Sequence, residues 1–134
     1  LHKQLRPIIA NSKQIQVTTK LGTNITFSIK NTHGYPEHLL KHQHGAFGNL
    51  PSGEIDSGVI NANGTIIIDG SMAGVGLLKE PIILKVTNNK AEITSNSEES
   101  LKLKDILDKI GTNAYLIAEF GIGTNSKAEL TGII

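Results

Sequence analysis

The chain has 134 residues, a formal net charge of +1 and no cysteine. This length corresponds to about one domain, and the lack of cysteine excludes disulfides, thiolate metal sites and cysteine nucleophiles. We expect no nucleic-acid partner, because no basic cluster marks the chain. We also expect no membrane partner, since no apolar run approaches the ~20 residues of a membrane span. These features favour a cytoplasmic protein.

The first predicted elements are two strands. Residues 14–20 (Q-I-Q-V-T-T-K) and 24–30 (N-I-T-F-S-I-K) alternate apolar and polar side chains and are rich in β-branched residues. A period of two predicts strands with one buried face. Leu21, Gly22 and Thr23 supply a turn between them, so the pattern predicts a β-hairpin.

The next segment, residues 31–63, has no period and is rich in Gly, His, Asn and Pro. A long segment without regular structure is unusual inside a compact domain and is often functional. His42 and His44 could bind a metal from an extended segment, and His44 is the stronger candidate. No nearby acid or cysteine completes a recognised ligand spacing, so a polar surface loop is the alternative.

Glu54 closes the motif P-S-G-E. Gly53 before it permits a tight turn or a close backbone approach. Taken alone, this motif favours a solvated loop acid, because carboxylates are seldom buried.

Strands are again predicted after Gly64. The apolar run 66–68 is bounded by glycines, which is typical of a strand covered on both faces. Residues 71–80 are predicted to form a loop. Residues 81–95 predict a second hairpin, in which Asn88 and Asn89 occupy the positive-φ positions of a tight turn.

One amphipathic helix is predicted over residues 97–111, S-E-E-S-L-K-L-K-D-I-L-D-K-I-G. Ser97 can cap its N-terminus and Gly111 can end it. We expect its apolar stripe to cover the sheet. The stripe has the spacing i, i+3, i+4, i+7 and consists of Leu103, Ile106, Leu107 and Ile110.

Residues 114–119 (A-Y-L-I-A-E) predict a further buried strand that runs into the turn F-G-I-G-T-N. Glu119 would then lie at the end of a buried strand, where an unpaired carboxylate is costly and a metal or cationic partner would remove the cost. The alternative is a solvent-exposed strand end. Asp69 ends the run 66–68 in a similar way, although an Asx-turn accounts for it equally well. Together the elements predict an α+β fold, a sheet-rich single domain with β-hairpins and one helix.

Three blocks of the sequence resemble a known family. They are F-G-N-L-P-S-G-E-I (47–55), N-G-T-I-I-I-D-G-S (63–71) and A-E-F-G-I-G-T-N (118–125). In this order and spacing they resemble the C-terminal region of the thermophilic metallo-aminopeptidases, the aminopeptidase T and S type, also called leucyl aminopeptidase-like. The resemblance runs from about Ile15 to the end of the chain.

The resemblance implies a hydrolase that removes N-terminal residues from peptides with two divalent metals, zinc or cobalt. It implies that Glu54 and Glu119 are metal ligands and that the protein is a homodimer. It also implies that residues 1–134 form an incomplete C-terminal domain, because the family's N-terminal α/β domain and last metal-ligand segment are not in this sequence. We therefore expect this piece by itself to be inactive.

Two other functions remain open at this point. Non-haem iron dioxygenases that open dihydroxypyridine rings are similar in the same blocks, and iron would be favoured by two histidines and a carboxylate. The chain could instead be a non-catalytic binding or oligomerisation module that kept the scaffold.

Overall fold

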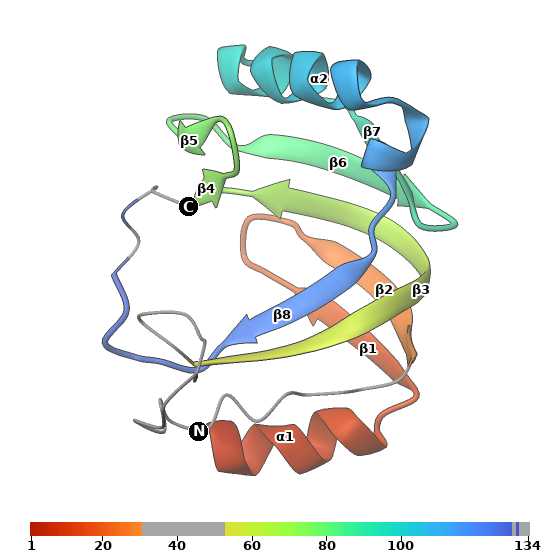
Figure 1. The fold of residues 1–134 in the computed structure, drawn as a ribbon, viewed down its shortest axis with the longest axis vertical. Helices are drawn as coiled ribbons and strands as arrows, with labels where there is room; N and C mark the ends of the chain where they lie inside the picture. The colour runs from red at the N-terminus through yellow and green to blue at the C-terminus, as the bar shows by residue number, and fades with distance from the viewer. Residues whose placement is uncertain (31–52, 130, 132–134) are drawn as a thin grey trace, which may run out of the picture.

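The fold is seen in a computed structural model that describes residues 1–30, 53–129 and 131. In that part of the chain the main feature is a six-stranded sheet in which every pairing is antiparallel (Figure 1). The sheet-rich α+β class is therefore confirmed. The strands are β1 (Gln14–Thr18), β2 (Asn24–Lys30), β3 (Glu54–Ile68), β6 (Ile82–Thr87), β7 (Lys90–Ile93) and β8 (Glu119–Gly123).

Strand β3 is the spine of the sheet, with 15 residues. Strand β2 pairs with one edge of β3, and β8 and β6 share the other edge. Gly58 shows this directly, because it pairs with Lys30 of β2 and with Glu119 of β8. Strand β8 thus takes the first part of that edge and β6 the last part.

A bulge bends β3 in its middle. Between the pairs Thr26–Asn63 and Ser28–Ile60 the register shifts, so two residues of β3 lie opposite Phe27. One of the two, Asn61, has a φ of 56°. A bulge of this kind bends its strand and increases the local twist, which lets the two ends of β3 belong to differently oriented parts of the sheet.

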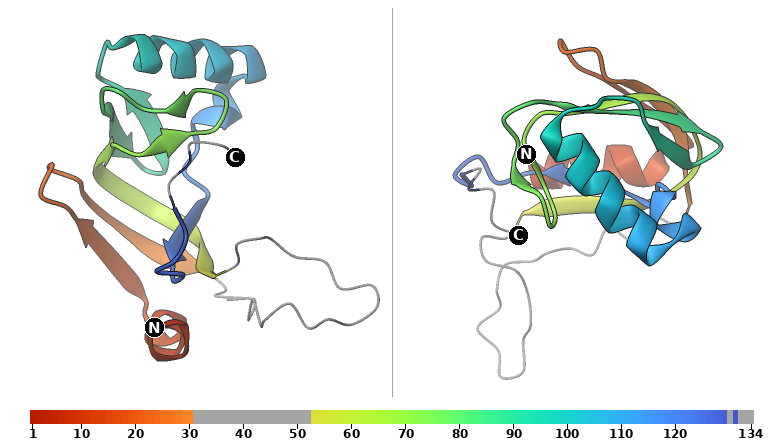
Figure 2. Two further views of the ribbon diagram at one scale, coloured as in Figure 1. Left: turned by 90° about the vertical axis from the view of Figure 1, so that its left-hand side faces the viewer. Right: turned by 90° about the horizontal axis from the view of Figure 1, so that it is seen from above.

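Helices lie at the two ends of the sheet (Figure 2). They are α1 (His2–Asn11) and α2 (Glu98–Ile110), and α2 is followed by a 3₁₀ turn, η1 (Thr112–Tyr115). The predicted caps of α2 are confirmed: Ser97 accepts a hydrogen bond from the Ser100 N–H at 3.2 Å, and Gly111 ends the helix with a φ of 109°.

The prediction of a single helix was wrong, because α1 is a second one. Its sequence contains Pro7, which weakens a helical signal. Ile9 is its only buried residue among those the structure describes. Tertiary contact, not local propensity, therefore accounts for α1.

The core lies between the inner face of the curved sheet and α2. Phe27 of β2 and Phe120 of β8 pack in it with ring centroids 5.0 Å apart. The expected hairpins are confirmed as β1–β2 and β6–β7, and Asn88 and Asn89 have φ values of 48° and 66° in the second turn. The buried cluster consists of Ile25, Phe27, Val59, Ala62, Ile82, Leu84, Val86, Ala91 and Leu103.

The C-terminal segment differs most from its prediction. The apolar run that predicted a buried strand over 114–119 forms the end of η1 and an irregular connection, with one bridge from Leu116 to Lys90. The supposed turn F-G-I-G is strand β8 itself. Glu119 therefore begins a strand and is exposed.

Smaller differences concern other segments. The stretch predicted to lack regular structure up to residue 63 contains β3 from Glu54 onward. The predicted loop at 71–80 contains a short hairpin, β4 (Ser71–Met72) and β5 (Gly76–Leu77). Ile110 is 71% exposed, so the last residue of the α2 stripe does not cover the sheet. No helix of the described ranges is long and apolar enough to cross a membrane.

Candidate functional site

Glu54 and Glu119 lie on one face of the ladder between β3 and β8. In its register Glu54 pairs with Gly123, Asp56 with Gly121, and Gly58 with Glu119. Since side chains alternate along a strand and paired residues share a face, Glu54, Asp56 and Glu119 project from the same side. Ile55, Ser57 and Val59 are buried on the other side.

The register also sets the spacing of the three carboxylates. Glu54 and Glu119 are four ladder positions apart, or about 14 Å at a rise of ~3.4 Å per residue. Asp56 lies between them, diagonal to Glu119 at roughly 7–8 Å between Cα atoms. One ion held by both glutamates would need both side chains extended toward it, whereas two neighbouring ions would fit this spacing more easily.

Glycines leave room for these side chains. The carboxylate of Glu54 lies over Gly121, where any Cβ would overlap its Oε1 atom. Gly123 and Gly58 also stand opposite an acid in the ladder. We call this surface the acidic face. It consists of the carboxylates of Glu54, Asp56 and Glu119 together with glycine backbone that carries no side chain.

Gly53 fixes the start of β3 beside the end of β8. Its φ is +126°, and a Cβ there would lie 2.9 Å from Asn125 Cβ. The Gly53 carbonyl accepts a hydrogen bond from the Thr124 N–H at 2.6 Å. The close backbone approach expected at Gly53 is confirmed. It places Glu54 in the first residue pair of the β3–β8 ladder.

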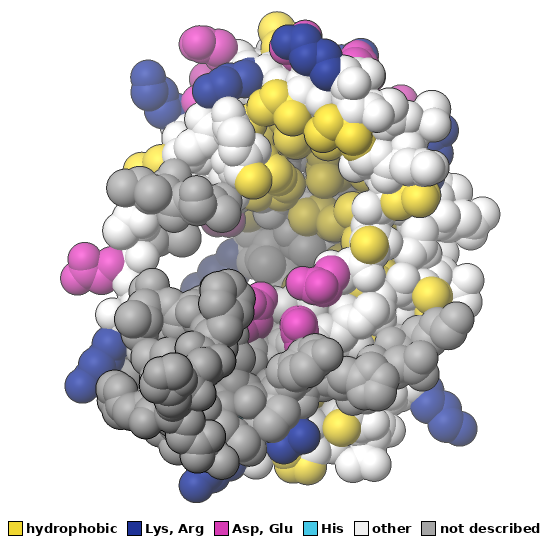
Figure 3. Space-filling view, in the orientation of Figure 1, with side chains coloured by type: hydrophobic (Ala, Val, Ile, Leu, Met, Phe, Trp, Pro, Cys, Tyr) yellow, Lys and Arg dark blue, Asp and Glu magenta, His cyan; other side chains and the backbone are white. Residues whose placement is uncertain are grey.

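One face of the molecule is hollowed (Figure 3). Asp and Glu side chains lie at the lower edge of the hollow, and hydrophobic side chains gather above them toward α2. An apolar wall beside a few polar groups is the usual make-up of a small-molecule site.

The histidines that the sequence offered as candidate ligands, His42 and His44, lie outside the described residues. His2 on α1 places its Nδ1 atom 3.3 Å from Thr124 Oγ1, just beyond β8. Its Nε2 atom is buried and has no hydrogen-bond partner among the residues that the structure describes.

Asp69, the other acid singled out from the sequence, does not join the acidic face. It is exposed and follows the last residue of β3, at the opposite end from Glu54.

By themselves Glu54, Asp56 and Glu119 do not form a metal-binding set. Within residues 1–30, 53–129 and 131, no three histidine or acidic side chains are close enough together to hold an ion. Carboxylate oxygens suit Mg²⁺ and Mn²⁺, whereas zinc and cobalt gain much of their affinity from imidazole. Glu54 and Glu119 would therefore need further ligands or a small movement of side chains.

Asp56 is the residue that sequence reasoning missed. Residues 55, 57 and 59 are buried in alternation with 54, 56 and 58. The apolar positions Ile55 and Val59 carried this signal, but the glycines and serines around them concealed the period. If E-I-D (54–56) had been recognised as part of a strand, the sequence would have predicted Glu54 and Asp56 on one face.

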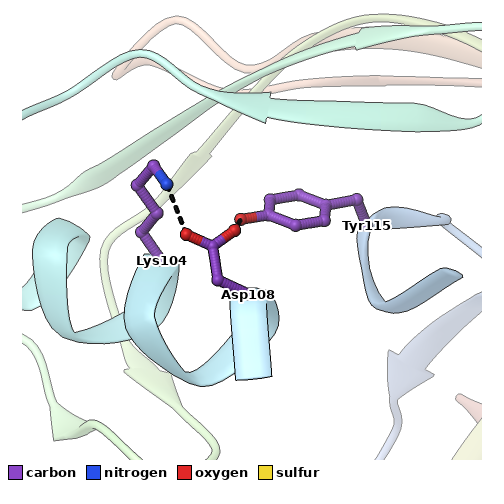
Figure 4. Close-up of polar contacts among 3 residues, drawn as sticks. All are labelled: Lys104, Asp108 and Tyr115. Carbon is purple, nitrogen blue, oxygen red and sulfur yellow. Dashed lines mark hydrogen bonds and ion pairs between the residues drawn. The ribbon is translucent and has the colours of Figure 1, made fainter. Parts of the chain in front are cut away.

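A second polar cluster lies on α2 and η1 (Figure 4). Asp108 accepts a hydrogen bond from the Tyr115 hydroxyl at 2.6 Å and forms an ion pair with Lys104. The Lys104 ammonium and the Tyr115 hydroxyl hold the pKa of Asp108 below its ordinary value. The hydrogen bond to Asp108 raises the pKa of both Lys104 and Tyr115. All three residues lie at the surface, and the cluster fastens η1 to α2.

An open cavity of about 690 Å³ lies beside this cluster. It contains none of the residues of the acidic face, so it is separate from the candidate metal ligands. Its lining includes the side chains of Lys85, Lys90, Glu92, Lys104, Thr112 and Tyr115.

Comparison with known proteins adds no assignment: no family model, curated protein or solved structure matches the chain.

Proposed function

We propose that Glu54 and Glu119 are ligands in a divalent-metal site, and that the protein containing this chain hydrolyses peptides from their N-terminal end. One observation supports the site: the β3–β8 register puts both glutamates on one exposed face, with Asp56 between them. The activity is inferred from the resemblance between the sequence blocks around both residues and those of metallo-aminopeptidases.

The charge of the face supports a cation. Asp56 and Glu119 form no ion pair with any described residue, and Glu54 adds a third carboxylate to the same side. A cation bound between them would be attracted by all three carboxylates.

The residues have separable roles in this proposal. Glu54 and Glu119 hold the metal, and Gly121 leaves the space in which the Glu54 carboxylate lies. Asp56 attracts the protonated α-amine of a peptide. A bound metal would polarise the scissile carbonyl and lower the pKa of a coordinated water.

Direct metal titration tests the site. Mn²⁺, Co²⁺ and Zn²⁺ would each be titrated into the chain by calorimetry. We expect Glu54→Gln and Glu119→Gln each to weaken the tightest-bound metal at least about tenfold, the equivalent of 1.4 kcal/mol. Glu92→Gln is the matched control, since Glu92 is an exposed acid on β7 away from this face. Unchanged affinity in both glutamate variants would refute the site.

The reaction is tested on the complete gene product. Leucine-p-nitroanilide hydrolysis should be lost in Glu119→Ala, with the circular dichroism spectrum retained. Full activity in that variant, or native metal analysis that finds iron in place of zinc or cobalt, would contradict the aminopeptidase proposal.

A further inference from the structure

Strand β8 has one paired edge and one open edge. Two hydrogen bonds at its ends identify which residues face β3. The Val59 N–H donates to the Ala118 carbonyl at 2.9 Å, and the Thr124 N–H donates to the Gly53 carbonyl at 2.6 Å. In an antiparallel pair the hydrogen-bonded residues alternate. Even-numbered residues of β8 therefore bond to β3, and odd-numbered residues face away.

The outward-facing residues are Glu119, Gly121 and Gly123. Each offers one N–H and one C=O, all three are exposed, and none of these groups has a hydrogen-bond partner within the described ranges. Glycine puts no side chain over the edge at two of the three positions. A Cβ at Gly123 would meet open space.

We propose that an extended peptide with a free amino terminus binds as an added strand along this open edge of β8. Backbone groups of an unpaired strand give affinity for an extended peptide without regard to its sequence. The same odd-numbered residues lie on the side that carries Glu54, Asp56 and Glu119. The carboxylates complement the charge of a protonated α-amine, which selects a peptide terminus over an internal segment.

The other open edges lack this combination. Strand β7 carries Lys90 and Glu92, and charged side chains discourage pairing at an edge. Strand β1 has no charged residue within Gln14–Thr18 and offers nothing that favours an amino terminus. The β8 edge alone combines bare backbone with acidic side chains in the part of the chain that the structure describes.

Two variants of one residue test the inference. Gly123→Pro removes one outward N–H and leaves the bonds to β3, whereas Gly123→Ala adds a methyl group and keeps the N–H. Binding of Leu-Val-Ala-Val amide with a C-terminal fluorophore would be followed by anisotropy in EDTA, so that no metal acts. We expect Gly123→Pro to bind at least about fivefold more weakly than Gly123→Ala, as loss of one hydrogen bond implies.

Modified peptides test the same edge without altering the protein. N-methylation at successive positions should weaken binding with a period of two, because only alternate N–H groups of an added strand point to its neighbour. N-acetylation of the amino terminus should weaken binding at least about fivefold. These measurements decide the matter even if Gly123→Pro does not fold.

Three results would overturn the inference. They are equal binding to the proline and alanine variants, N-methyl effects without a period of two, and self-association that Gly123→Pro abolishes while no peptide binds. The inference that the peptide has a free amino terminus rests on the proposed aminopeptidase function. The inference that a strand binds at the open edge of β8 does not. Peptide binding in EDTA by a complete gene product that binds no metal would therefore refute that function and leave the edge standing.

Discussion

At the scale of single residues, the acidic face depends on the residues opposite each carboxylate. Gly121 and Gly123 weaken a strand intrinsically, because glycine has no side chain to pack and loses much entropy on folding. In β8 they give Glu54 a place for its carboxylate and leave backbone exposed. The two glycines therefore lower the intrinsic stability of β8. They also leave acidic side chains and main chain accessible together on one surface.

A residue-scale prediction concerns Tyr115. Its hydrogen bond to Asp108 raises its pKa above the ordinary value of 10.0. In a Tyr35→Phe background, spectrophotometric titration should show one tyrosine that ionises above that value. Adding Asp108→Asn should move the midpoint down toward it. A midpoint that does not move would show that the contact is not kept in solution.

The same shifts give this contact a pH window with a defined sign. Because the pKa of Tyr115 is raised, its contribution to stability is present below pH 10.0 and is lost as the pH rises through the folded-state pKa. Because the pKa of Asp108 is lowered from 3.8, its contribution is present above that value and is lost as the pH falls through the folded-state pKa. Both effects are small, since solvent screens exposed charges.

At the scale of elements, β3 serves three partner strands only because it bends. Next to the bulge, Gly64 allows the backbone of β2 to lie close, with a φ of +139° and with Ile25 Cα 2.7 Å from where a Cβ would stand. The obstructing atoms belong to the backbone of β2, which cannot rotate away as a side chain could. This position therefore restricts the residue type more than the open glycines of β8 do.

Gly64→Ala should lower the free energy of unfolding by about 2 kcal/mol or more, through positive-φ strain and contact with β2. Gly123→Ala is the control, because its Cβ meets open space, and it should stay within about 0.5 kcal/mol. Urea denaturation of both variants measures the difference. If the two variants were equally stable, β2 and β3 could move apart at Gly64 without a cost in free energy.

At the scale of the whole molecule, Asn89 joins the two parts of the sheet. It lies in the β6–β7 turn and fills the gap that β8 and β6 leave along the edge of β3. Its Oδ1 accepts from the Ala62 N–H at 2.8 Å, and its Nδ2 donates to the carbonyls of Val59 at 3.0 Å and Ile117 at 2.8 Å. One side chain thus fastens β3 to the connection before β8.

Asn89→Gly removes these three bonds and suits a φ of 66°. We expect the free energy of unfolding to fall by about 2–4 kcal/mol, at roughly 1 kcal/mol for each bond plus the burial of unpaired groups. The Ala62 amide should also exchange faster with solvent. Asn88→Gly is the matched control in the same turn, because the Asn88 side chain has no hydrogen bond to any described residue and φ is 48°. If the two variants are equally stable, Asn89 does not join the sheet.

The sequence by itself determined the elements whose signal is local. Alternation within 24–30 predicted β2, the paired asparagines predicted the β6–β7 turn, and Ser97 and Gly111 predicted both ends of α2. It also singled out Glu119, whereas Glu54 was singled out only by the resemblance to metallo-aminopeptidases. Periodicity, turn conformation and capping each depend on residues a few positions apart, so no tertiary contact was needed to recognise them.

Only the tertiary structure decided how the two acids are related. The segment E-F-G-I-G has a period of two carried only by Phe120 and Ile122, and its glycines predicted a turn, but it pairs with β3 as strand β8. That pairing put Glu119 on the side of Glu54, brought Asp56 between them and left one edge of β8 open. This register joins residues more than 60 positions apart and depends on long-range hydrogen bonds. A shift of one residue would turn every side chain of the strand to the opposite face.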